Sequence, residues 1–205
     1  MPSKNTIKIY AGDSYYHIYN RGANQDVVFH DKRDYSVFLS LFKRYLSPTE
    51  MVDDKGRPYK NMSSDISLIS YCLMPNHFHL LCLNKNPEGI QYLMRSICTA
   101  YSMYYNRRYN HSGHVFQGIY KATLIDSDRY LQHISRYIHR NPVDYLNYEY
   151  SSYLPIVNNW EIPWLNLENF WLTFEGNTID YESFVADYEN YTDTLDEMIH
   201  TLADS

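Results

Sequence analysis

The spacing of apolar positions predicts four strands in the first 125 residues. Ser14–Arg21 is rich in aromatic residues and alternates imperfectly, which favours a strand. Ile66–Leu73 and His77–Leu83 are apolar runs separated by three residues only, so we expect them to form an antiparallel hairpin. A fourth strand is predicted over Gly118–Ile125, after a connection over Gly113–Gln117.

Three further segments have the periodicity of amphipathic helices. Lys32–Tyr45 repeats apolar residues every three or four positions and follows Asp31, a good N-cap. Asn86 is expected to cap a second helix, with Pro87 at its first position and its end near Tyr109. A third helix, Asp128–Asn141, must end at the proline that follows.

The order of these elements predicts an α+β fold. A β-α-β-β-α-β succession is typical of a ferredoxin-like antiparallel sheet with both helices on one face. The other face then remains available for the third helix or for a ligand. We therefore predict one domain over residues 1–144, followed by an acidic, mainly helical extension over residues 145–205.

Composition places the chain among globular proteins of a reducing compartment. Hydrophobic residues make up 44% and charged residues 20% of the 205 positions, and no window is apolar enough to span a membrane. The first 22 residues contain no apolar signal segment. The three cysteines form no CxxC pair, which indicates free thiols. We expect a cytoplasmic protein without membrane association.

Charge is distributed unevenly along the chain. The net charge is −6, but the segment from Trp160 to Ser205 holds 11 acidic residues and no Lys or Arg. The preceding residues, with all 18 basic side chains, are net positive, which is compatible with a polyanionic partner. The 23 tyrosines suit base stacking as well as half-buried packing, so they favour nucleic acid only slightly.

His77 and His79 form the first candidate for chemistry. Side chains alternate along a strand, so both imidazoles point to one face while Phe78 and Leu80 point to the other. Two imidazoles two residues apart lie about 6–7 Å from each other, close enough to share one metal ion. Because the apolar pair faces the helices, the histidines are expected on the open face.

The helix Asp128–Asn141 holds the second candidate. Tyr137 and Asn141 lie one turn apart at the edge of its apolar face, so the helix can bring a hydroxyl and an amide carbonyl toward the histidines. Tyr130 shares the same stripe, and geometry alone does not choose between the two tyrosines. The alternative is a tyrosine that packs at a helix edge and an asparagine that ends the helix.

Several separated motifs resemble the HUH single-tyrosine transposases, most strongly those of the REP-associated branch. The resemblance covers about residues 15–155, with the motifs in the same order. They are Tyr16–Gly22 (YHIYNRG), Tyr71–Leu81 (YCLMPNHFHLL), Gly113–Gln117 (GHVFQ) followed by Tyr120, Arg136–Val143 (RYIHRNPV) and Tyr150–Tyr153 (YSSY).

The resemblance implies roles for four residues. His77 and His79 bind a divalent cation, Tyr137 is the nucleophile, and Asn141 supplies a third ligand where relatives outside this branch often have glutamine. It also implies cleavage and rejoining of single-stranded DNA beside a hairpin through a 5′-phosphotyrosine. Mg²⁺ or Mn²⁺ is expected, and two imidazoles suit Mn²⁺ better. Both a monomer and a homodimer agree with the resemblance.

Contacts to DNA are less specific in the sequence. Eight basic residues lie on elements that can border the site, including Arg95 and Arg136. The six that we predict to bind DNA are Arg21, Arg107, Arg108, Lys121, Arg129 and Arg140. Two other functions remain open: a non-catalytic single-stranded nucleic-acid-binding module of the same fold, and a zinc-type hydrolase without a covalent intermediate.

Overall fold

A computed structural model describes residues 10–174 and 178–187 of the chain. The last part of the acidic extension, residues 188–205, lies outside the described residues. The strands are β1 (Ser14–Arg21), β2 (Ile66–Met74), β3 (His77–Asn84) and β4 (Lys121–Ile125). The helices are the 3-10 turn η1 (Ala23–Gln25), α1 (Lys32–Leu46), α2 (Gly89–Tyr109), α3 (Asp128–Arg140), α4 (Tyr153–Val157), α5 (Leu167–Thr173) and α6 (Thr178–Ala186).

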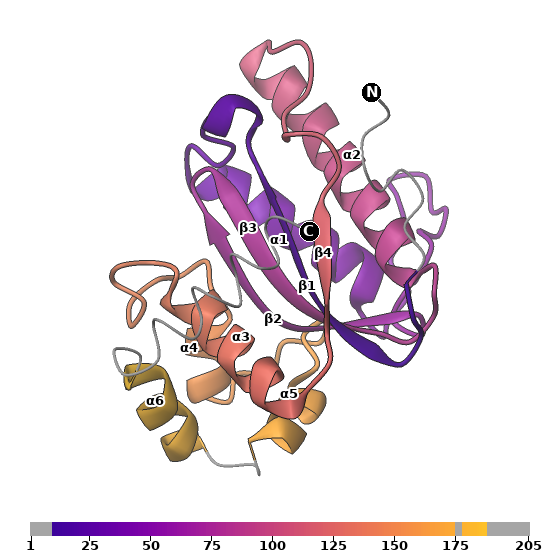
Figure 1. Ribbon diagram of the computed structural model, residues 1–205. Coiled ribbons are helices and arrows are strands. Elements are labelled where there is room, and N and C mark those ends of the chain that lie inside the picture. The colour runs from indigo at the N-terminus through magenta and orange to yellow at the C-terminus, as the bar shows by residue number, and fades with distance from the viewer. Residues whose placement is uncertain (1–9, 175–177, 188–205) are drawn as a thin grey trace, which may run out of the picture.

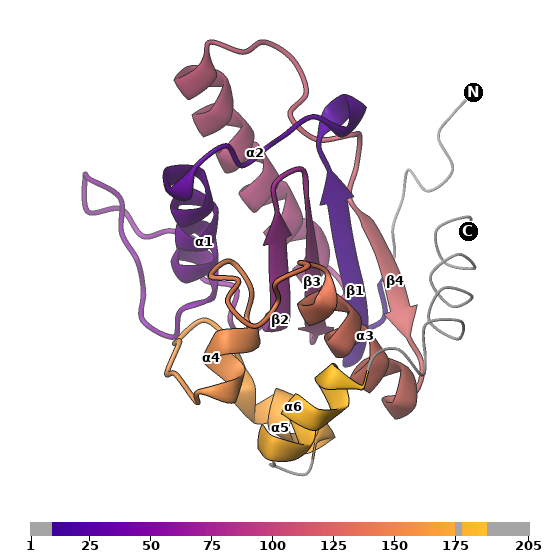
Figure 2. The same ribbon diagram turned by 90° about the vertical axis from the view of Figure 1, so that its left-hand side faces the viewer.

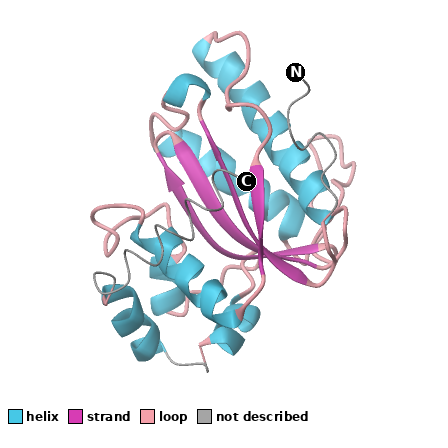
Figure 3. Cartoon of the chain, viewed as in Figure 1, coloured by secondary structure: helices cyan, strands magenta, loops and turns pink. Residues whose placement is uncertain are grey.

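The four strands form one sheet in the order β2-β3-β1-β4, with every neighbouring pair antiparallel. Helices α1 and α2 cover one face, whereas α3 and the elements after it lie on the other side (Figure 1, Figure 2). Figure 3 shows how the C-terminal helices gather beside α3. This arrangement is the ferredoxin-like one, so the fold class predicted from the sequence is confirmed.

Two apolar cores lie on either side of the sheet. The first packs α1 and α2 against one face, with Phe38, Phe78 and Tyr101 fully buried among its members. The second packs α3 against the opposite face, where Ile134 and Ile138 are fully buried. Alternation along β3 separates the two cores, because neighbouring side chains on a strand point to opposite faces.

The segment after α3 joins the second core. Tyr181 of α6 and Ile156 of α4 are fully buried there, beside the buried residues of α3. The chain also covers the exposed edge of β2: Leu73 N donates to Tyr150 O (2.9 Å) and Ser152 N donates to Tyr71 O (2.9 Å). Covering an edge strand in this way removes unpaired backbone groups that would otherwise favour association with other chains.

Helix α2 begins later than the sequence predicts. The expected start at Pro87 with Asn86 as cap is wrong, because α2 begins at Gly89 and Asn86 Oδ1 instead accepts from Glu88 N in a short turn (3.1 Å). Asp65 O holds this turn by accepting from Lys85 N (2.9 Å) and Asn86 N (3.0 Å), and Gly89 lies against the same carbonyl. A Cβ there would lie 2.7 Å from Asp65 O, so the chain approaches the β2 entry closely at this point.

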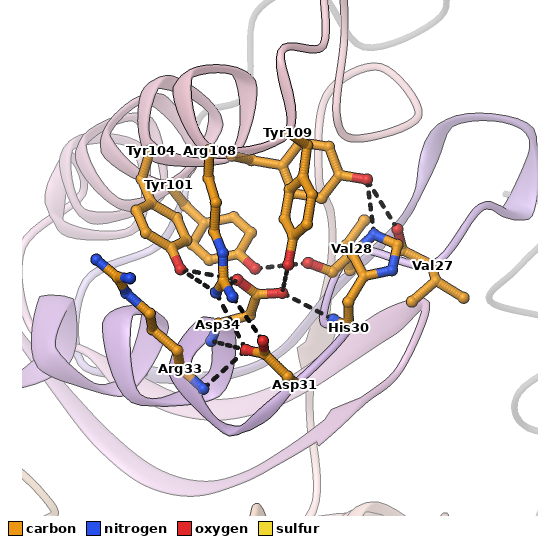
Figure 4. A network of polar contacts seen from close by, with 11 residues as sticks. Val27, Val28, His30, Asp31, Arg33, Asp34, Tyr101, Tyr104, Arg108 and Tyr109 are labelled. Carbon is orange, nitrogen blue, oxygen red and sulfur yellow. Dashed lines mark hydrogen bonds and ion pairs between the residues drawn. The ribbon is translucent and has the colours of Figure 1, made fainter.

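A buried carboxylate ties the start of α1 to the end of α2 (Figure 4). Asp34 is fully buried, and its Oδ1 accepts from Arg108 Nη1 (2.7 Å) and from Tyr104 Oη (2.8 Å). Its Oδ2 accepts from Tyr109 Oη (2.7 Å) and His30 N (2.8 Å). Four donors on one carboxylate offset its loss of hydration, so this contact fixes the two helix ends relative to each other.

Within the described part of the chain, no helix is both long and apolar enough to span a bilayer.

Candidate functional site

Helix α3 carries Tyr137 to the histidine pair. Ser127 caps the helix by accepting from Tyr130 N, and the apolar stripe of α3 packs onto the sheet face that displays the histidines. The Tyr137 ring lies edge-on to His79, with 5.3 Å between ring centroids. His77 and His79 are themselves 5.1 Å apart between centroids. The structure thus brings three of the four predicted residues together on the open face.

The geometry distinguishes Tyr137 from Tyr130, which the sequence could not do. Tyr137 is half-buried and contacts His79, whereas Tyr130 is 6% exposed and packs into the second core. Burial raises the pKa of Tyr130 to about 12, with the neighbouring Asp126 and Tyr19 adding to the effect. Tyr130 is therefore a core residue and a weak acid, so it is the less suitable nucleophile.

Asn141 directly follows α3 and faces His77. Its Oδ1 lies 2.9 Å from His77 Nε2, while His77 Nδ1 donates to Asn76 Oδ1 at 2.7 Å. A carboxamide oxygen can only accept, so Asn76 fixes the proton of a neutral His77 on Nδ1. The lone pair on Nε2 then points toward Asn141, and two ligands of one octahedral cation at about 2.1 Å lie roughly 3 Å apart.

The donor set fits a divalent cation of intermediate hardness. Among residues 10–174 and 178–187 no group of three or more His, Cys, Asp or Glu side chains could hold a metal ion. The third donor facing the histidines is instead the amide oxygen of Asn141. Two imidazoles with one amide oxygen suit Mn²⁺ and tolerate Mg²⁺, and they lack the thiolates or third imidazole of common zinc sites.

His17 lies beside the histidine pair, although no pattern in the sequence placed it there. Its Nε2 lies 2.9 Å from His79 Nδ1, and the two rings stack with 5.1 Å between centroids. Its ring also meets the edge of Tyr137 at 5.9 Å. Alternation puts His17 and Tyr19 on one face of β1, and Tyr19 pairs with His79 in the register. The register that pairs Tyr19 with His79 would have placed His17 near the site, but the sequence alone does not predict this register.

Burial keeps the imidazoles in the neutral form that binds metals. It lowers the pKa of His17 to about 3, and it lowers the pKa of His79 well below its usual range, with the charges of His17 and His77 adding to the effect. Burial also lowers the pKa of His77, while the Asn141 oxygen, which would accept a hydrogen bond from the protonated ring, opposes this change. The site is therefore ready for a cation at neutral pH without losing protons.

Two of the six predicted DNA-binding residues border the site. Arg21 pairs with His77 across β1 and β3, is exposed, and its Nε donates to Gln117 Oε1. Lys121 is also exposed, and its Nζ lies 5.9 Å from the ring centroid of Tyr19. Both place positive charge beside the histidines, where a phosphate would be bound.

The other four predicted DNA contacts lie elsewhere. Arg107 and Arg129 are exposed near the end of α2 and at the start of α3. Arg140 lies over the Tyr145 ring at 4.5 Å. Arg108 forms ion pairs with Asp31 (2.5 Å) and Asp34 (2.7 Å), so its guanidinium is engaged within the protein. Binding of DNA by these four residues therefore stays a prediction.

Two comparisons with known proteins found a match. Residues 58–141 match the sequence model of the family described as "Transposase IS200 like", a range that includes both histidines, Tyr137 and Asn141. No curated protein matches the chain. A solved REP-associated tyrosine transposase bound to a REP hairpin is similar in fold, with a TM-score of 0.54 at 13% identity, covering 79% of this chain and 89% of that one. The family match and the shared fold support the resemblance of this chain to the HUH tyrosine transposases.

Proposed function

We propose that this protein is a metal-dependent endonuclease and strand transferase of the transposase kind, acting on single-stranded DNA. The observation that carries the proposal is the convergence of His77, His79, Asn141 and Tyr137 on one face of the sheet. All four belong to one chain, so a single protomer supplies the nucleophile and the metal ligands. This favours a monomer as the active species.

Tyr137 acts as the nucleophile in the proposed reaction. Its phenolic oxygen attacks a backbone phosphorus, a new P–O bond forms, and the bond from phosphorus to the 3′ oxygen breaks. The phenol loses its proton and the departing oxygen takes one up, which leaves a 5′-phosphotyrosine and a free 3′-hydroxyl. Because the number of ester bonds is conserved, an incoming 3′-hydroxyl can reverse the step and join strands without a further energy source.

The divalent cation supplies charge stabilisation at the phosphate, which compensates for the weak nucleophilicity of a phenol. Asn76 and His77 are already hydrogen-bonded in the form that leaves His77 Nε2 able to bind. Tyr137 needs little movement because its ring already contacts His79. Mn²⁺ or Mg²⁺ is the expected cofactor, with Mn²⁺ favoured by the imidazoles.

The proposed substrate is single-stranded DNA that carries a hairpin near the cleavage site. The structurally similar REP-associated transposase is bound to a REP hairpin, and its fold extends over most of this chain. Arg21 and Lys121 are well placed to contact backbone phosphates, since both are exposed at the border of the histidine pair. Such contacts position a strand without reading its sequence.

Covalent capture of DNA tests the proposal. Hairpin-bearing single-stranded oligonucleotides are incubated with the protein and Mn²⁺, and a denaturing gel separates covalent adducts. We expect an adduct with the wild type and with Tyr130→Phe, the matched control on the same helix, but none with Tyr137→Phe. Cleavage that persists in Tyr137→Phe would indicate a hydrolase instead. Tight binding without cleavage in the wild type would indicate a binding module.

A further inference from the structure

We propose that His17 is a positioning residue that holds His79 in the tautomer able to bind the cation. This proposal rests on the metal site of the proposed function. It adds His17, a residue to which the resemblance to known transposases assigns no role. His17 Nε2 lies 2.9 Å from His79 Nδ1. When His79 donates its Nδ1 proton to His17, its lone pair is on Nε2, the nitrogen left free for a metal.

Asn76 shows the same arrangement at the other histidine. Its Oδ1 lies 2.7 Å from His77 Nδ1 and cannot donate, so His77 must carry its proton there and leave Nε2 for a cation. Each histidine of the pair thus has its Nδ1 engaged by a neighbour: an amide oxygen for His77 and an imidazole for His79. Metal-binding histidines commonly donate the second ring nitrogen to such a partner, which fixes the ring orientation.

The surroundings of His17 hold its ring in this position. It is 4% exposed, and the Tyr19 ring stacks on it with 5.0 Å between centroids and 26° between planes. Tyr19 also stacks on His79 at 5.8 Å, and Tyr137 meets the His17 ring edge-on. A ring confined by aromatic contacts on several sides cannot rotate away from His79, so the hydrogen bond is preorganised.

Two substitutions separate this role from simple packing. His17→Phe retains a ring of similar size but removes the acceptor. His17→Gln retains an acceptor at a similar distance along the side chain but removes the ring. The matched control is Tyr16→Phe, which alters a buried neighbour on the opposite face of β1. Mn²⁺ affinity is measured without DNA by isothermal titration calorimetry, and thermal unfolding of the metal-free proteins shows whether each variant folds.

We expect His17→Phe to weaken Mn²⁺ binding by about 10- to 100-fold, the range found when such partners of metal ligands are removed. His17→Gln should recover most of the affinity, and Tyr16→Phe should bind like the wild type. Wild-type affinity in His17→Phe would overturn the proposal. Equal losses in the Phe and Gln variants would also overturn it, because only packing would then matter.

The outcome is separable from that of the DNA assay. If His17→Phe binds Mn²⁺ more weakly than the wild type and His17→Gln recovers the affinity, the positioning role stands even where no covalent DNA adduct forms. If the wild type and His77→Ala bind Mn²⁺ equally weakly, the metal site itself is wrong, and the role of His17 fails with it.

Discussion

Replacing Asp34 with asparagine is expected to destabilise the protein strongly, although the two side chains have nearly the same shape. Asp34 is fully buried and accepts four hydrogen bonds, from Arg108, Tyr104, Tyr109 and the backbone of His30 (Figure 4). In Asp34→Asn one oxygen becomes an NH₂ group. If the remaining oxygen faces Arg108, the new donor faces His30 N, which cannot accept.

The magnitude follows from these contacts. One buried backbone N–H without a partner costs about 1–3 kcal/mol, and a charge-assisted hydrogen bond that becomes neutral loses about 1 kcal/mol. Together they give a loss of roughly 3 kcal/mol in the free energy of unfolding. For a chain of 205 residues this corresponds to a fall in melting temperature of about 6–12 °C.

Circular dichroism during thermal and urea denaturation measures the effect. The matched control is Asp31→Asn: Asp31 is half-exposed, pairs with the same arginine, and caps α1 through acceptors that asparagine also has. We expect the control to unfold close to the wild-type midpoint. If Asp34→Asn and Asp31→Asn unfolded at the same midpoint, the reasoning would be refuted. The negative charge of the buried Asp34 carboxylate would then contribute nothing measurable to the free energy of unfolding.

Three other predictions follow from close contacts. Gly22→Ala should lower both stability and Mn²⁺ affinity in calorimetric titrations, because its Cβ would lie 2.1 Å from Asp26 O while Gly22 N donates to the turn that precedes His77. Lys121→Ala should reduce the slope of log Kd against log salt for single-stranded DNA by about one, as expected for a single lost phosphate contact. Arg136→Met should lower the free energy of unfolding by about 2–4 kcal/mol, because the guanidinium donates to backbone carbonyls at the end of α6. For the same reason, hydrogen exchange should accelerate in α6 before it accelerates in the sheet. Unchanged exchange in α6 would count against the last of these.

The sheet and the histidine pair could be predicted because they depend on local patterns. The short link between Ile66–Leu73 and His77–Leu83 allows only a hairpin, and alternation along one strand sets which side chains share a face. The same reasoning failed for the start of α2. There Asp65 O accepts from Asn86 N and lies against Gly89, and the local capping signal of Asn86 does not reveal these tertiary contacts.

The polar residues of α3 show why the remainder of the site was not predictable. Arg136 appears in the sequence as a candidate phosphate contact, since arginine is seldom fully buried without a partner. In the structure it is fully buried, because Phe184 and Asp187 provide acceptors from about 50 positions later in the chain. No local pattern reveals partners at that separation. The burial of Arg136 on α3 can therefore be recognised only from its contacts with α6 and the residue that follows it.

The same docking explains how the chain holds Tyr137, the proposed nucleophile, in place. His139 is fully buried on α3, where its Nδ1 pairs with Tyr181 Oη of α6 and its Nε2 lies 2.7 Å from Ser152 Oγ. Ser152 Oγ in turn accepts from Tyr71 N of β2 (2.8 Å). Moving α3 away from the sheet would break these bonds and leave several buried polar groups without partners, at a cost of about 1–3 kcal/mol for each group. Because Tyr137 lies on this helix, the described part of the C-terminal segment, through its contacts with α3, helps to keep the tyrosine beside His77 and His79.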